Sequence, residues 1–127
     1  MATVQITSQN FADTLKKGGI VLLDWWAPWC GPCRAFGPIF ERVAATNPDI
    51  VFGKVNSDEE QALARQYNIN SIPTLMIIRD STLLFEQAGM LPEKTLADLI
   101  AQARQVDMEK VKRETAKEQP TAQAAFG

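Results

Sequence analysis

Apolar and polar residues alternate along this chain in patterns that predict five strands. The segment IVLLDWW at 20–26 is apolar almost throughout and is bounded by glycine and proline, which is typical of a strand covered on both faces. Shorter apolar runs predict the other strands: TVQI at 3–6, DIVFGKVN at 49–56, PTLMIIRD at 73–80 and TLLFEQAG at 82–89. Because only Asp80 and Ser81 connect the last two strands, we expect that pair to be antiparallel.

Helical patterns separate most of these strands. They are SQNFADTLKKGG at 8–19, CGPCRAFGPIFERVAATN at 30–47, SDEEQALARQYNI at 57–69 and LPEKTLADLIAQARQV at 91–106. Ser8 is the predicted N-cap of the first helix, and Pro92 begins the last. The strand, helix and strand between residues 20 and 56 imply a parallel pair with a right-handed crossover. The predicted fold class is therefore α/β, with a central mixed five-stranded sheet and helices on both faces.

The apolar stripe of the last helix fades after Val106. The charges from Arg104 to the end nearly cancel, with five basic residues against four acidic ones. We therefore expect one domain at 1–106 and a charged C-terminal extension at 107–127, which is partly helical and then disordered.

Composition and charge exclude several classes of function. The chain has 127 residues, 46% of them apolar, so it can bury one core without cross-links. With 13 basic residues against 15 acidic ones it has no basic stripe, and we expect neither nucleic acid nor a membrane as a partner. No signal-peptide pattern opens the sequence, which predicts a cytoplasmic protein. Histidine is absent, so hydrolases that depend on an imidazole base are excluded.

The two cysteines lie together in the stretch DWWAPWCGPC, which ends at Cys33. Cys30 falls where the loop after the strand meets the predicted helix, and Pro32 occupies the first turn, where its missing N–H costs nothing. The free N–H groups and the positive dipole end of a helix stabilise a thiolate. This placement makes Cys30 the candidate attacking sulfur and Cys33, within bridging reach, the candidate resolving sulfur.

Three other interpretations of this pair are weaker. A structural disulfide would close too small a loop to add much stability, and a reducing cytoplasm would open it. A tetrahedral metal site needs four ligands, so two chains would have to share one ion or iron–sulfur cluster. An inert buried pair is the third. A redox dithiol is the favoured hypothesis, and we expect no metal and no bound cofactor.

Asp24 interrupts the most apolar strand of the chain. A carboxyl buried there loses hydration, so its pKa should rise toward the range in which it can exchange protons. Lys54, in the apolar strand VFGKV, is the obvious nearby cation. The pair is either a buried ion pair that satisfies itself or a device for proton transfer to and from Cys33. Pro73, by contrast, is on composition alone an ordinary proline at the start of a strand.

An ordered set of residues extends well beyond the WCGPC motif and resembles the thioredoxin family over roughly residues 3–103. The set comprises Asp24, Trp26, Ala27, Trp29, Cys30, Gly31, Pro32, Cys33, Pro38, Lys54, Ile72, Pro73, Thr74 and Gly89. A lone CxxC is a weak signal, whereas this order is very specific. The resemblance implies a thioredoxin fold and a protein-disulfide reductase that acts through a mixed disulfide. An alternative is a thioredoxin-fold binding module in which the dithiol is incidental.

The resemblance also implies roles for single residues. Cys30 would be an exposed nucleophile, Cys33 the buried resolving cysteine, Asp24 a buried acid and Lys54 the residue that tunes it. A substrate groove, with Pro73 as a cis-proline, would be lined by Trp29, Gly31, Pro32, Ile72, Pro73 and Gly89. The substrate chain would pair with the backbone at Ile72. The implied partners are disulfide-containing proteins and an NADPH-dependent thioredoxin reductase.

The chain departs from the family pattern at a few positions. Pro28 stands where a polar residue is usual and should stiffen the loop, and Ser71 replaces a common glycine. Met90 follows Gly89 where a smaller residue is usual, so it should crowd the groove. These changes bear on the range of substrates rather than on the chemistry.

Overall fold

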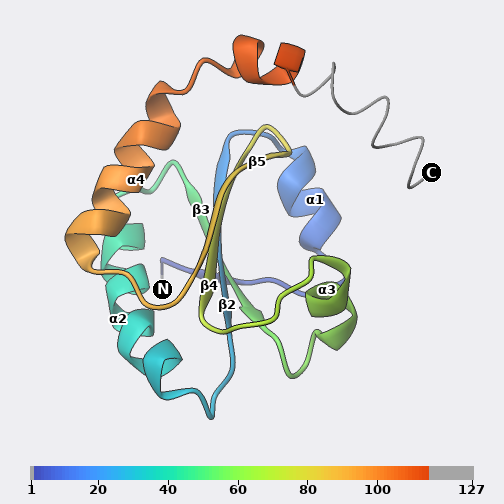
Figure 1. Cartoon of the computed structure of the whole chain (residues 1–127), viewed down its shortest axis with the longest axis vertical. Helices are drawn as coiled ribbons and strands as arrows, with labels where there is room; N and C mark the ends of the chain where they lie inside the picture. The colour runs from blue at the N-terminus through green and yellow to red at the C-terminus, as the bar shows by residue number, and fades with distance from the viewer. Residues whose placement is uncertain (1, 115–127) are drawn as a thin grey trace.

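The structure is a computed structural model that describes residues 2–114. Within them the elements follow the predicted order (Figure 1). The elements are β1 (Val4–Gln5), α1 (Phe11–Lys16), β2 (Ile20–Trp26), α2 (Gly31–Ala45), β3 (Val51–Asn56), α3 (Gln61–Gln66), β4 (Thr74–Arg79), β5 (Thr82–Ala88) and α4 (Glu93–Gln105). No helix among residues 2–114 is both long enough and apolar enough to cross a membrane.

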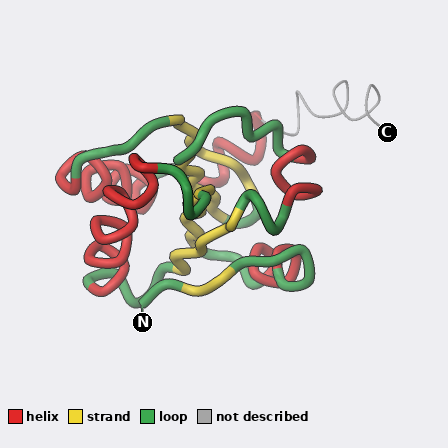
Figure 2. Tube along the Cα trace, turned by 90° about the horizontal axis from the view of Figure 1, so that it is seen from below, coloured by secondary structure: helices red, strands yellow, loops and turns green. Residues whose placement is uncertain are grey.

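The strands form one mixed sheet in the order β1-β3-β2-β4-β5. β2 pairs with β3 in parallel and with β4 antiparallel, and β4 and β5 form the antiparallel hairpin that the short connection predicts. Helices α2 and α4 cover one face, and α1 and α3 cover the other (Figures 1 and 2). The predicted α/β class is confirmed. Because β2 is paired on both edges and covered on both faces, its continuous apolar run has a physical explanation.

Alternate residues of β2 face opposite layers of the core. Leu22 belongs to the apolar cluster of α2 and α4, whereas Leu23 belongs to the cluster that includes Phe11 of α1 and Leu63 of α3. The period of two places Asp24 on the same face as Leu22, toward α2. The carboxyl therefore lies on the side of the sheet from which the cysteine-bearing helix starts.

The first helix is shorter than its sequence pattern suggests, and the prediction of Ser8 as its N-cap is wrong. Asn10 is the N-cap, and residues 8–10 form a turn in which the Thr7 carbonyl accepts hydrogen bonds from the N–H groups of Asn10 and Phe11. The Ser8 N–H donates instead to a carboxylate oxygen of Glu60 at 2.9 Å, a contact distant in sequence.

Helix α3 is also shorter than the predicted range 57–69. The backbone carbonyl of Asn56 accepts the N–H of Glu60 at 2.8 Å, and its side-chain oxygen accepts the N–H of Asp58 at 3.0 Å. These bonds hold residues 57–60 in a turn, because an asparagine side chain competes with helical pairing for nearby N–H groups. The helix accordingly begins only at Gln61.

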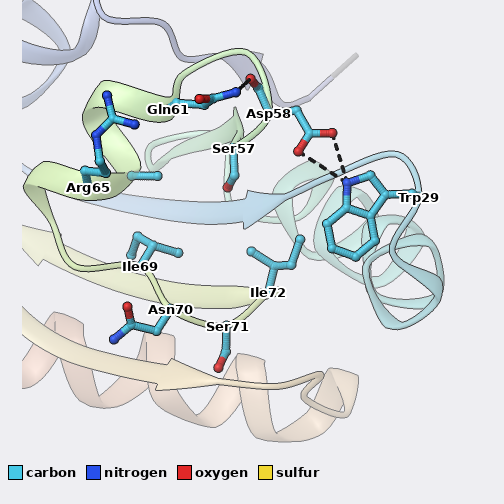
Figure 3. Close-up of a pocket in the computed structure, with 10 residues that line it drawn as sticks. Trp29, Ser57, Asp58, Gln61, Arg65, Ile69, Asn70, Ser71 and Ile72 are labelled. Atoms are coloured by element: carbon cyan, nitrogen blue, oxygen red, sulfur yellow. Dashed lines mark hydrogen bonds between the residues drawn. The ribbon is translucent and has the colours of Figure 1, made fainter.

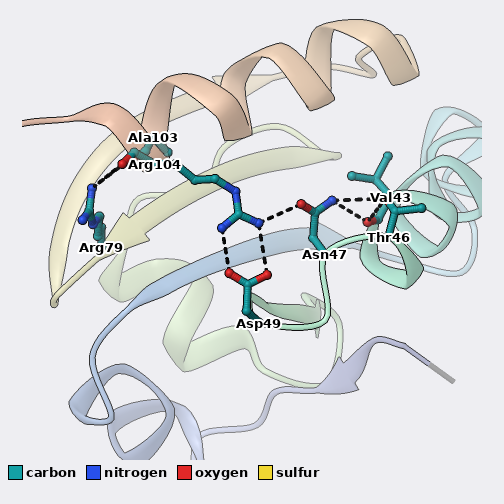
Figure 4. A network of polar contacts seen from close by, with 7 residues as sticks. All are labelled: Val43, Thr46, Asn47, Asp49, Arg79, Ala103 and Arg104. Carbon is teal, nitrogen blue, oxygen red and sulfur yellow. Dashed lines mark hydrogen bonds and ion pairs between the residues drawn. The ribbon is translucent and has the colours of Figure 1, made fainter.

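Two arginines anchor the end of α4 (Figure 4). The guanidinium of Arg104 forms two hydrogen bonds to Asp49, at 2.7 and 3.1 Å, and a third to the Asn47 side chain at 2.8 Å. One nitrogen of Arg79 donates to the carbonyl of Ala103 at 2.9 Å and also reaches those of the next residue and of Val106. A cation on the last carbonyls of a helix satisfies acceptors that have no partner in the helix and favours the negative dipole end.

The start of the C-terminal extension packs against the domain. Residues 108–114 are helical, and Met108 is only 9% exposed. Lys112 lies 3.6 Å from a carboxylate oxygen of Asp80 in the β4–β5 turn. This contact is at the opposite end of the sheet from the loop that precedes α2 (Figure 1). The predicted disorder at 115–127 lies outside the described residues, and the boundary at 106/107 stays a prediction.

Two truncations test where the domain ends. We expect a protein ending at Val106 to lose about 1–2 kcal/mol of its free energy of unfolding, because Met108 no longer adds a buried side chain. A protein ending at Ala103 should be less stable still. It lacks the ion-paired Arg104 and the later carbonyls that Arg79 binds. Urea unfolding of the two truncations and the full chain measures both losses. Equal stability of the two truncations would contradict this boundary.

Candidate active site

The loop between β2 and α2 is a tight turn with a proline in the position that best suits it. The N–H of Cys30 donates to the carbonyl of Ala27 at 3.2 Å, so residues 27–30 form a β-turn in which Pro28 is the second residue. Proline is favoured at this position because its φ is already set. The side chain of Arg34 also donates to the Pro28 carbonyl at 3.0 Å. Pro28, which departs from the family pattern, therefore stabilises the approach to the first cysteine.

Cys30 is the N-cap of α2, and Cys33 lies in the first turn, as the sequence indicates. The backbone N–H of Cys33 points at the Cys30 sulfur, 3.2 Å away, and the two cysteines form a disulfide. The expectation that Cys30 is exposed is wrong for this oxidised form, because Cys30 is 4% exposed and Cys33 3%. The carbonyl oxygen of Ile72 lies 3.7 Å from the Cys30 sulfur and covers it from the neighbouring loop.

Asp24 is completely buried, and neither of its carboxyl oxygens has a hydrogen-bond partner among the described residues. Burial raises the pKa of this carboxyl from 3.8 to about 7, and the positive charge of Lys54 opposes part of that rise. A carboxyl with a pKa near 7 can take up and release a proton at neutral pH. The predicted rise is thus present, with desolvation as its larger cause.

Lys54 lies directly opposite Asp24 in the pairing of β2 with β3. Its ammonium is 4.7 Å from the centre of the Trp26 ring, and a Cβ added to Gly37 of α2 would lie 3.7 Å from it. Among residues 2–114, no ion pair within 4.0 Å joins Lys54 to Asp24. The ammonium lies over an aromatic face, so the geometry does not show the self-satisfied ion pair of the first interpretation.

Pro73 follows a cis peptide bond, which sequence composition alone did not predict and the family resemblance did. Its carbonyl accepts the N–H of Gly89 at 2.8 Å, which ties the start of β4 to the end of β5. Gly89 has φ +97°, where a side chain would be strained. Ile72, Pro73 and Gly89 are therefore brought together beside the Cys30 sulfur.

Trp29 projects from the turn and is 67% exposed. Its indole N–H donates to both carboxylate oxygens of Asp58, at 3.0 and 3.2 Å (Figure 3). Sequence reasoning missed Asp58. The available signal was its position two residues after β3, because parallel β2 and β3 end at the same edge of the sheet. Trp29 and Ile72 both line a surface pocket of about 310 Å³ that extends over α3.

Two further predicted groove residues belong to α2 itself. Gly31 and Pro32 are exposed in the first turn of α2, and a Cβ on Gly31 would meet no atom within 4 Å. Met90, beside Gly89, is 44% exposed. Neither Gly31 nor Pro32 lines the surface pocket that Trp29 and Ile72 share. Residues 2–114 contain no cluster of three or more side chains suited to a metal ion.

Comparison with known proteins gives one family. The chain matches the thioredoxin family model over residues 2–102. It is 48% identical over 121 residues to a Streptomyces coelicolor protein named "Putative thioredoxin 2", covering 95% of this chain and 90% of that one. It is 37% identical over 101 residues to the thioredoxin of Bacillus subtilis, covering 79% and 96%.

A solved structure shares the architecture. The short form of thioredoxin f from spinach chloroplast superposes with a TM-score of 0.74 and 28% identity, covering 80% of this chain and 93% of that one. The sequence match, the fold and the Cys30–Cys33 pair at the start of α2 agree with one another. The chain belongs to the thioredoxin family of thiol–disulfide oxidoreductases, and its fold is the thioredoxin fold.

Proposed function

We propose that Cys30 is the nucleophile and Cys33 the resolving cysteine of a protein-disulfide reductase. The observation that carries this assignment is the N–H of Cys33 pointing at the Cys30 sulfur at the N-terminus of α2. Reduction of the disulfide leaves that N–H and the positive end of the helix facing the sulfur of Cys30. Both favour its thiolate over its thiol.

The reaction proceeds by two exchanges of sulfur partners. The Cys30 thiolate attacks one sulfur of a substrate disulfide, forms a mixed disulfide and releases the other substrate sulfur as a thiolate, which takes a proton from solvent. The Cys33 thiol then loses its proton and attacks the Cys30 sulfur. This step releases the second substrate thiol and leaves the Cys30–Cys33 disulfide, so the substrate gains two electrons and the protein loses two.

Asp24 accepts the proton of Cys33 in the second step, and the positive charge of Lys54 limits how far the pKa of Asp24 rises. The support is the pKa of about 7, set by burial against the opposing charge of Lys54. Asp24 also lies on the face of the sheet that α2 covers, and Cys33, like Cys30, is buried at the start of that helix. A general base in this role needs the proton to reach it directly or through one water molecule.

The substrate chain lies in a shallow groove over Trp29, Gly31, Pro32, Ile72, Pro73 and Gly89. Support comes from the backbone of Ile72, whose N–H makes no hydrogen bond among the described residues and whose carbonyl lies 3.7 Å from the Cys30 sulfur. An extended chain pairs with free backbone groups of this kind. The open space above Gly31 and Gly89 leaves room for its backbone.

The oxidised protein needs an external source of two electrons. An NADPH-dependent flavoprotein reductase of the thioredoxin-reductase class is the proposed donor, since thioredoxins named as such are among the relatives. The reduced dithiol is maintained only in a reducing compartment, which supports the cytoplasm as the site of action.

Serine variants test the assignment of the two cysteines. Cys33→Ser should form a mixed disulfide with a substrate such as insulin and stop there, because no second thiol resolves it. Cys30→Ser should form none. Both variants should lose at least about a hundredfold in catalysed insulin reduction, since each step is needed for turnover. Non-reducing gels and mass spectrometry identify the adduct. Equal trapping by both variants would reverse or remove the assignment.

Asp24→Asn tests proton transfer. We expect insulin reduction driven by dithiothreitol to slow by about tenfold or more between pH 6 and 8, because an amide cannot accept the Cys33 proton. The wild-type rate should rise as Asp24 ionises near pH 7, and the variant should lose this step in the profile. Asp13→Asn, at an exposed aspartate, is the matched control. An unchanged pH–rate profile would contradict the proposed role.

The same variant makes a prediction about stability. A carboxyl whose pKa is higher in the folded protein binds more protons there, so the free energy of unfolding falls as the pH rises from about 4 to about 7. Asp24→Asn removes this loss. In the oxidised form it should be more stable than the wild type by about 4 kcal/mol at pH 8, and by far less at pH 4. Urea unfolding at the two pH values measures the difference. A gain that is the same at both would show that Asp24 does not titrate as stated.

A further inference from the structure

We propose that the pocket between Trp29 and α3 binds an acidic side chain of the substrate, with Arg65 as the cation that recognises it. The inference rests on the proposed function, because it takes the substrate chain to lie at Ile72. It adds a determinant of substrate choice outside the predicted groove. The ligand class is a peptide that carries Asp or Glu close to its disulfide-bonded cysteine.

The pocket is continuous with the place where the substrate disulfide reacts. Its lining includes Ile72, whose carbonyl lies 3.7 Å from the Cys30 sulfur. From there the pocket extends past Ile69 toward Arg65 on α3, with Trp29 at the opposite end (Figure 3). Its volume of about 310 Å³ suits one or two side chains rather than a large ligand. A peptide paired at Ile72 would therefore direct a neighbouring side chain into it.

The pocket is lined by two charged residues, Asp58 and Arg65, which differ in their polar partners. The carboxylate of Asp58 accepts the Trp29 indole N–H with both oxygens, at the Trp29 end of the pocket. Arg65 is the only cation of the lining, and among the described residues no carboxylate lies within 4.0 Å of its guanidinium. A guanidinium has five N–H donors arranged to bind a carboxylate through two of them. The guanidinium of Arg65 can therefore bind an anionic group of a ligand in this pocket.

Uncharged polar residues also line the pocket. One of them is Ser57, whose hydroxyl is buried and has no hydrogen-bond partner among residues 2–114. Asn70 and Ser71 are lining residues too, on the side of Ile69 and Ile72 that lies away from Arg65 in Figure 3, and both side chains can donate hydrogen bonds. Ile69 offers apolar surface to the methylene groups of a glutamate. A lysine in this position would instead meet the charge of Arg65.

Matched peptides test the inference. Each peptide carries a fluorophore and one cysteine, and a disulfide joins this cysteine to a quencher, so reduction increases the fluorescence. A single Glu stands at one of the three positions on either side of the cysteine. A second set carries Gln at the same positions. Second-order rate constants are measured with the pre-reduced full-length protein. We expect Glu to exceed Gln by about threefold to tenfold at one or two adjacent positions, an advantage that falls as salt is added.

Variants of Arg65 show whether this residue is responsible. Arg65→Gln should bring the Glu-to-Gln ratio to about one, and Arg65→Glu should bring it below one. Both variants should still reduce the Gln peptides, which shows that they are folded. Arg113→Gln changes the net charge by the same amount as Arg65→Gln, in the helical segment 108–114 at the opposite end of the sheet from the disulfide (Figure 1), and should keep the wild-type ratio.

The outcomes separate this inference from the function on which it rests. If the wild type reduces all peptides but prefers Glu at no position, or if Arg65→Gln keeps the preference, the acidic-side-chain site is wrong and the reductase assignment stands. If Arg113→Gln lowered the Glu-to-Gln ratio as much as Arg65→Gln does, the preference would come from the net charge of the protein. That result would also overturn the proposed site at Arg65. If no peptide is reduced by the pre-reduced wild type, the proposed function itself fails.

Discussion

The site depends on one constraint, the complete enclosure of β2. Hydrogen-bonded to β3 and β4 and covered by helices on both faces, this strand has no freedom to shift its register. It therefore holds the Asp24 carboxyl in the core, and it delivers the turn at Pro28 and the start of α2 to one fixed place at the edge of the sheet. A strand at the edge of the sheet could not have buried a carboxyl so fully.

Two electrostatic effects of opposite sign then set the chemistry. The low-dielectric interior disfavours the charged carboxylate of Asp24, whereas Lys54, its neighbour in the pairing of β2 with β3, favours it. The ammonium stays over the Trp26 ring, so the attraction offsets only part of the desolvation. The resulting pKa of about 7 leaves the carboxyl able to hold or release a proton at neutral pH. At the N-terminus of α2, the backbone N–H of Cys33 points at the sulfur of Cys30.

The two ends of the sheet carry different parts of the protein, the reactive site at one end and stabilising contacts at the other. One end carries the disulfide, the exposed Trp29 and the pocket with Arg65, so chemistry and proposed substrate choice share it. At the other end, Arg79, Arg104 and the helical residues 108–114 fasten α4 to the β4–β5 turn and to the loop before β3. Because these contacts lie far from the cysteines, the extension can stabilise the domain without entering the reaction.

Local signals were sufficient for much of the fold and part of the site. The bounds of β2, the placement of Cys30 and Cys33 at the start of a helix, and the β4–β5 hairpin follow from apolar runs, turn residues and capping preferences, which act over a few residues. The raised pKa of Asp24 could be argued as well, since a carboxyl in a buried strand must lose water wherever its neighbours are.

The tertiary structure alone decided what depends on contacts between distant segments. It took the Ser8 N–H to Glu60, paired Trp29 with Asp58 and covered Cys30 with the Ile72 carbonyl. It also left Arg65 with no carboxylate of residues 2–114 within 4.0 Å. Such contacts are set by the order of strands and the packing of layers, and no short window of sequence contains both partners.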